Sequence, residues 1–149
     1  MRFAFLSALA LGAALTAAGP AAAQSSPTTT LTVNIAGLKN NQGVCKVCLF
    51  NKPDGFPNED AKALRCVEAS IKGTASQYVF ANLPAGTYAV AVVHDENHNK
   101  KLDTNFMGIP KEQYGASRGA RGGVGGPPKF APASFLLSEP VASLLVTME

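Results

Sequence analysis

Alternating hydrophobic and polar residues mark several short segments of the chain as β-strands. Between Leu31 and Ile35, apolar side chains alternate with Thr32 and Asn34, and the run ends at Gly37. A period of two is typical of a strand with one buried face. Six further runs have a similar character: residues 44–50, 65–71, 77–81, 87–94, 133–137 and 141–148.

Gly, Pro and Asn residues separate these runs, and the only stretch of helical period covers residues 58–64. Seven short strands joined by turns predict an all-β, antiparallel Greek-key sandwich of two sheets. A small closed barrel is the competing architecture. The segment Leu83–Tyr88 also fits a tyrosine corner, in which the Tyr88 hydroxyl bonds back to the upstream backbone.

One segment is too long for an ordinary connection. Between His94 and Ala133 lie 38 residues, and residues 115–126 contain six glycines. Loops of this length are usually functional or disordered. We expect an ordered loop with a mobile glycine tip, and disorder of residues 115–126 is the alternative. The apolar residues expected to anchor this loop on the sandwich are Phe106, Met107, Ile109, Tyr114 and Phe130.

The N-terminal residues have the pattern of a signal peptide. Arg2 precedes an apolar stretch from Phe3 to Ala18, and Ala21–Ala23 supplies small residues for cleavage. The stretch is shorter than the roughly 20 residues that span a bilayer. We therefore predict a signal peptide over 1–23, a flexible leader over 24–30, and one domain over 31–149. The protein would be periplasmic or secreted, with no transmembrane segment after cleavage.

The charge of the chain is small. The formal net charge is +3, Arg2 contributes one of these charges, and both signs are scattered along the sequence. A net charge this small, with both signs scattered, gives no argument for nucleic acid or an anionic membrane as the partner. An envelope component, a glycan or a peptide is the expected partner.

The three cysteines predict one disulfide. Residues three apart in a strand point to opposite faces, so Cys45 and Cys48 should not form a redox pair despite their spacing. Cys45 shares a face with Val47 and Leu49, whereas Cys48 would lie on the outward face. If the neighbouring strands pair, Cys66 lies on that outward face too. In an oxidising compartment we expect a Cys48–Cys66 bridge, with Cys45 left as a buried thiol.

The polar run after His94 has the spacing of a calcium loop. Two departures weaken this reading: Lys100 stands where glycine normally allows the sharp turn, and Phe106 stands where a bidentate glutamate would complete the shell. A metal-free turn, in which Asn and Asp bond their own backbone, is the alternative. Binding would be weak, with a dissociation constant on the order of 10⁻⁴ to 10⁻³ M. The candidate calcium ligands are Asp95, Asn97, Asn99, the backbone carbonyl of Lys101, and Asp103.

Catalytic chemistry is hard to assign. His94 and His98 do not have a known zinc spacing, and both fit structural loop roles. Arg118 and Arg121 could hold an anion or form a solvated loop tip. No nucleophile and base pair is visible, which favours a non-catalytic binding or structural protein. An enzyme of undescribed type using His94, Asp95 and the long loop is the alternative.

Two stretches carry a resemblance to known families. Residues 79–88 resemble the turn of transthyretin-like and carboxypeptidase-regulatory-like domains. The continuation over residues 89–130 resembles a bacterial exported family, domain of unknown function 2141, and this match covers about Leu31 to Thr147 and is dense from Phe80 to Phe130. The resemblance implies a prealbumin-like sandwich outside the cytoplasm and no assigned activity. The chain departs from the family pattern in its three cysteines, Arg118 and Arg121. It also lacks the C-terminal Tyr-Arg-Gly-Ser of the transthyretin-like relatives that hydrolyse 5-hydroxyisourate.

Overall fold

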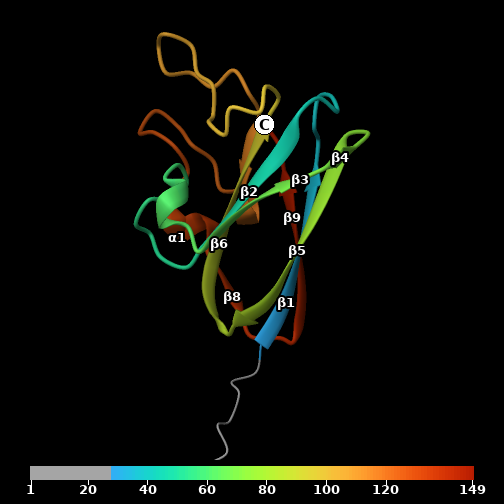
Figure 1. Cartoon of the computed structure of the whole chain (residues 1–149). Helices are drawn as coiled ribbons and strands as arrows, with labels where there is room; N and C mark the ends of the chain where they lie inside the picture. The colour runs from blue at the N-terminus through green and yellow to red at the C-terminus, as the bar shows by residue number, and fades with distance from the viewer. Residues whose placement is uncertain (1–27) are drawn as a thin grey trace, which may run out of the picture.

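The protein is mostly β, and its strands form two facing sheets (Figure 1). A computed structural model describes residues 28–149, so the predicted signal peptide and residues 24–27 lie outside the described residues. The nine strands are β1 (Thr28–Ala36), β2 (Val44–Phe50), β3 (Arg65–Ala69), β4 (Ile71–Lys72), β5 (Ala75–Pro84), β6 (Gly86–Asp95), β7 (Tyr114–Ala116), β8 (Phe135–Leu137) and β9 (Val141–Thr147). Three short helical turns accompany them: η1 (Asp60–Lys62), η2 (Ser117–Gly119) and α1 (Phe130–Ala133).

The four-stranded sheet has the order β4-β5-β1-β9, and the five-stranded sheet has the order β3-β2-β6-β7, with β8 paired to the start of β6. The prediction of an all-β sandwich is therefore confirmed. Two separate sheets, rather than one continuous one, set it apart from the closed barrel. The edge strands β7 and β9 of the two sheets approach each other at one side, where Tyr114 of β7 and Glu149, just after β9, exchange backbone hydrogen bonds at 3.4 and 2.9 Å.

The expected all-antiparallel pairing was wrong at one place, because β1 and β9 run parallel. The chain leaves β8 at the far end of the five-stranded sheet and reaches β9 through a short turn. The backbone N–H of Thr30 donates to the carbonyl of Pro140 at 2.9 Å, which places the start of β9 beside the start of β1. On its other side, β1 extends back to Thr28 because Thr28 and Thr29 pair with Pro84 and Leu83 of β5, so residues 28–30 belong to a strand rather than to a flexible leader.

The strand count was also wrong: the structure has nine strands instead of seven. The run over residues 65–71 divides at Ser70, so β3 pairs with β2 in one sheet and β4 pairs with β5 in the other. The Ser76 hydroxyl donates to the Ser70 carbonyl at 2.8 Å and fixes this crossing. The second extra strand is β7, which lies inside the long segment. The helical stretch expected over residues 58–64 is reduced to the 3-10 turn η1.

The main core lies between the sheets and follows the predicted alternation. Val33 and Ile35 of β1 face Val90 and Val92 of β6 across it, and all four are buried. The hydroxyl of Tyr88 donates to the Pro84 carbonyl at 2.7 Å, which confirms the tyrosine corner. This bond ties the start of β6 to the end of β5.

A second apolar layer covers the outer face of the five-stranded sheet. Phe56 packs edge-to-face against Phe50 at 5.2 Å and against Phe130 at 5.8 Å. The small residues Ala89 and Ala133 let the chain around α1 lie close to β6. This layer holds the segments after β2 and after β7 against the sheet, and these segments frame the site described below.

Candidate functional site

A tight polar turn begins where β6 ends. Asp95 is buried, and its carboxylate accepts hydrogen bonds from the backbone N–H groups of Asn99, at 3.0 Å, and Lys100, at 2.7 Å. The side-chain oxygens of Asn97 and Asn99 accept backbone N–H groups two residues further on, at 3.1 and 2.8 Å. The candidate calcium ligands are therefore brought together, as members of nested Asx turns.

The amide nitrogens of the two asparagines point inward. Asn97 donates to Asp103 at 2.6 Å, and Asn99 donates to the other oxygen of Asp103 at 2.8 Å. The residues thus fit a metal-free turn better than a calcium site, because N–H donors face the carboxylate that a cation would need. Lys100 adopts a φ of 65°, so it takes the left-handed conformation for which glycine is the usual residue.

Glu112 holds both ends of this turn and was not among the predicted site residues. Its side chain is buried, with oxygens that accept the backbone N–H groups of Glu96 and Asp103, each at 3.0 Å. The Glu112 carboxylate therefore holds both ends of the segment from 96 to 103 from its buried side. The sequence has no local signal for this role, since Glu112 stands among turn residues sixteen positions from its first partner.

The structure places His94 and Asp95 on opposite faces of β6. His94 is fully buried, and its Nε2 lies 2.8 Å from the Gln42 carbonyl. Both carboxylate oxygens of Asp95 are engaged by the backbone. The two residues expected in the enzyme alternative therefore do not face a common space. His98 is exposed on the turn.

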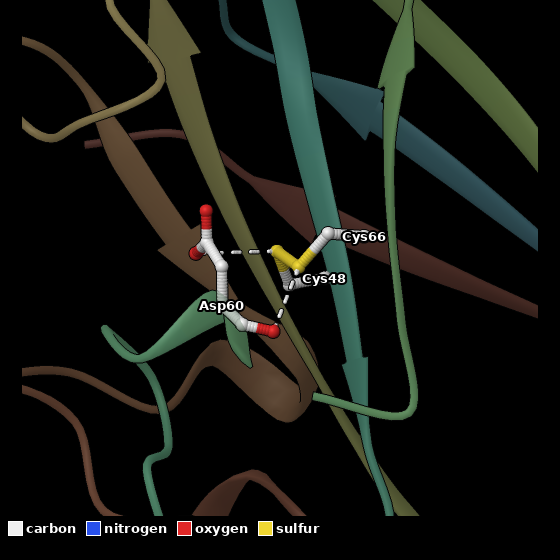
Figure 2. A group of neighbouring side chains, drawn as sticks. All are labelled: Cys48, Asp60 and Cys66. Atoms are coloured by element: carbon white, nitrogen blue, oxygen red, sulfur yellow. Dashed lines mark hydrogen bonds between the residues drawn. A yellow bond between two sulfur atoms is a disulfide. The ribbon is translucent and has the colours of Figure 1, made fainter. Parts of the chain in front are cut away.

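The disulfide lies beside the site and joins the predicted cysteines. Cys48 and Cys66 are bonded across β2 and β3, with Cα atoms 4.1 Å apart, and Asp60 lies next to the two sulfur atoms (Figure 2). Cys48, Asp60 and Cys66 lie close enough together to suggest a metal site. They do not form one, because the sulfur atoms of a disulfide are not thiolate ligands. The carboxylate is instead paired with Lys46 at 2.9 Å.

Cys45 is the free cysteine among the described residues, and it is buried in the main core, as predicted. Burial raises the pKa of its thiol to about 11, although the neighbouring Ser76 side chain lowers this pKa in part. Its position on the opposite face of β2 from Cys48 agrees with the expectation that the two do not form a redox pair.

The long segment is ordered by anchors that differ from those expected. Phe130 packs in the second apolar layer, and Tyr114 lies in β7. Phe106, Met107 and Ile109 instead face solvent, with exposed fractions of 95%, 64% and 53%. The expectation that these three anchor the loop was wrong, because a turn around Asn105 directs them outward from the sheet.

Part of the glycine-rich run is a strand and not a disordered tip. At Gly115 of β7, an added Cβ would lie 2.8 Å from Val146 Cγ1 and 2.8 Å from the Thr147 carbonyl oxygen. Glycine is therefore required where β7 approaches β9. After β7, the buried Ser117 hydroxyl accepts the Val90 N–H at 2.9 Å and donates to the Ala133 carbonyl at 2.5 Å.

A cavity of about 430 Å³ lies between these loops on the outer side of β6 and β7. Ala91 and Val93 line it on the β6 side, and Ile109 and Pro110 contribute to its wall. Gly122, Gly123 and Gly126 supply backbone on the other side. A second hollow of about 600 Å³ shares Val93 and Leu102 with it and extends to Lys46, Lys100 and Lys101. We call the region that contains these two hollows and the loops after β6 and β7 the loop end of the five-stranded sheet.

The two arginines of the glycine-rich run do not converge on one ligand. Arg121 pairs with the C-terminal residue Glu149 at 2.5 Å, whereas Arg118 is exposed in η2. Of the two alternatives for these arginines, a paired grip on an anion is therefore not formed by the described residues. The described residues also contain no helix long and apolar enough to cross a membrane.

These observations define the class of protein as a two-sheet β-sandwich with a loop-built hollow at one end. The chain belongs to the family described as an uncharacterized protein conserved in bacteria (DUF2141), whose sequence profile matches residues 33–144. This confirms the family resemblance. Neither the curated proteins nor the solved structures contain a significant match.

Proposed function

We propose that this protein is an exported, non-catalytic binding module of the cell envelope. Its binding face is the loop end of the five-stranded sheet. The observation that carries the proposal is the cavity of about 430 Å³ beside the exposed Phe106 and Met107. Hollows of this size accept small ligands, and exposed apolar side chains next to them are typical of interaction sites.

Two features support a location outside the cytoplasm. The pattern of residues 1–23 is that of a signal peptide. The Cys48–Cys66 disulfide is consistent with an oxidising compartment, since such bonds are rare in the cytosol. We therefore propose a periplasmic or secreted protein.

The non-catalytic part of the proposal rests on the buried polar residues. His94 and Asp95 lie on opposite faces of β6. The Ser117 hydroxyl is already hydrogen-bonded to two backbone groups. A general base must lie within hydrogen-bond reach of the group that it activates. Among the described residues we find no such pair with access to the cavity, which supports binding over the enzyme alternative.

At the level of the fold, we propose a transthyretin-like Greek-key sandwich. The tyrosine corner at Tyr88 supports this, since such corners occur in Greek-key sandwiches. For the polar turn we propose the metal-free state. Calcium binding through Asp95 and Asp103 is the second candidate, favoured by the left-handed conformation of Lys100.

The binding proposal is tested by native isolation of the tagged protein from cell envelopes. Three forms are compared: wild type, Phe106→Ser/Met107→Ser, and Leu136→Ser. Leu136 is also exposed, at 72%, but lies at the opposite end of β6. We expect a co-isolated component that the loop variant loses and the Leu136 variant retains. Equal recovery from all three forms would contradict the proposal.

A further inference from the structure

Two neighbouring loop tips present apolar side chains to solvent. Phe106 and Met107 stand at the tip of the turn over residues 104–110, and Val124 stands fully exposed at the tip of the glycine hairpin. Both loops line the same cavity, through Ile109 and Gly123, so they are neighbours at the loop end (Figure 1). We call Phe106, Met107, Ile109 and Val124 the tip patch.

The backbone holds these side chains outward. The Asn105 side-chain oxygen accepts the N–H groups of Met107, at 2.9 Å, and Ile109, at 3.0 Å. Gly123 and Gly126 exchange backbone hydrogen bonds at 2.8 and 2.9 Å below Val124. The tips are thus formed before any partner arrives. Large apolar side chains held in water in this way mark an interaction site.

The segment that carries the tip patch contains more basic than acidic residues. Residues 97–133 contain six basic and two acidic residues, whereas the rest of the described chain contains six basic and eight acidic residues. Glu112 is buried, and both oxygens of Asp103 accept amide N–H groups. Lys100 pairs with Glu68 and Arg121 pairs with Glu149, whereas Lys111 and Lys129 are exposed and form no ion pair within residues 28–149.

We propose that the tip patch docks on an anionic lipid bilayer. The apolar tips enter the boundary between headgroups and acyl chains, and the surrounding basic side chains contact lipid phosphates. This inference rests on the proposed function, in which the loop end is the binding face. Apolar side chains combined with basic charge are the two features that hold peripheral proteins on anionic membranes.

The shape of the patch favours a bilayer over a peptide. A peptide would need to fill the recessed cavity, whereas the exposed apolar surface lies at the outermost points of two loops. The small net charge of the whole chain conceals this arrangement, because the acidic residues lie mainly outside 97–133.

The protein contains no tryptophan, so a single introduced tryptophan reports on one position. The Phe106→Trp variant is mixed with vesicles of equal parts phosphatidylglycerol and phosphatidylcholine, and with vesicles of phosphatidylcholine alone. We expect a blue shift of its emission with the anionic vesicles only. The Leu136→Trp variant, at the other end of the sheet, should show no shift.

Affinity measurements separate the two contributions. The Phe106→Ser/Met107→Ser variant should bind anionic vesicles about tenfold or more weakly, as expected for the loss of a buried aromatic ring. Lys111→Gln/Lys129→Gln should weaken binding and reduce its dependence on salt. The matched control Lys52→Gln/Arg65→Gln, at exposed basic residues toward the opposite end of β2 and β3, should bind as wild type does.

The absence of a blue shift with anionic vesicles at low ionic strength would overturn the lipid proposal, and so would an equal shift in both tryptophan variants. If vesicle binding fails while recovery of an envelope component still depends on Phe106 and Met107, the lipid is rejected and the binding module stands. If both fail, the loop end is not a binding face.

Discussion

Glu112 accepts a hydrogen bond from the backbone N–H of Asp103 at 3.0 Å, from a buried position behind the polar turn. The second oxygen of the same carboxylate accepts the N–H of Glu96 at the other end of the turn. One side chain therefore connects the end of β6 to the start of the long segment. The conformation of the loop end depends on this clamp.

Replacing Glu112 with alanine should destabilise the protein. Two backbone N–H groups would lose a charged acceptor, and hydrogen bonds of this kind contribute about 1.5–3 kcal/mol each. We expect the free energy of unfolding to fall by about 2 kcal/mol or more in urea denaturation. Glu139→Ala, at an exposed position, is the control. A Glu112→Ala protein as stable as the control would show that the clamp does not matter.

Calcium should not stabilise the protein through the polar turn. The oxygens of Asp95 and Asp103 are occupied by N–H donors, so an ion would have to displace them. We expect an unchanged midpoint of thermal unfolding when chelated protein is titrated to several millimolar calcium. A saturable rise in wild type that disappears in Asp103→Asn would instead establish the calcium site.

Loss of the disulfide should lower stability by about 3 kcal/mol, because the bond closes a loop of 18 residues in the unfolded chain. The Cys48→Ala/Cys66→Ala variant tests this by urea denaturation. Reductant should lower the stability of wild type and leave the double variant unchanged. If reductant affects both proteins equally, the bridge is not the source of the effect.

Cys45 should make the protein sensitive to alkaline pH. Burial raises the pKa of its thiol from 9.0 to about 11, so between these values the unfolded chain loses a proton that the folded protein keeps. The free energy of unfolding should therefore fall from pH 9 to 11 more steeply in wild type than in Cys45→Ala. The native thiol should also resist alkylation at pH 8. Rapid alkylation of folded protein would refute this account.

The period of two located β1 because it has one buried and one more open face, whereas β2 and β6 are buried on both faces and were marked by nearly continuous apolar runs. It failed at β7, where Gly115 lacks a side chain so that β9 can approach, and a glycine carries no hydrophobic signal. It also merged β3 with β4, because Ser70 lies between two runs of the same alternation. The parallel pairing of β1 and β9 depends on contacts between chain ends, which local patterns do not record.

The candidate site was predicted in part. The polar turn and the disulfide followed from spacing and strand faces, which are local properties. The role of Glu112 depends on a fold-level contact with a segment sixteen residues away. Phe106 was misassigned because hydrophobicity alone does not distinguish an anchor from an exposed tip. The turn made by Asn105 decides between these two roles.

The claim that the loop end is the binding face is tested most directly by photo-crosslinking in living cells. A photoreactive phenylalanine analogue is placed at Phe106 in one strain and at Leu136 in another. Both side chains are exposed, at 95% and 72%, and they lie at opposite ends of the five-stranded sheet. We predict crosslinks to an envelope component from position 106 and none from position 136. Crosslinks from neither position, or equal crosslinks from both, would contradict the claim.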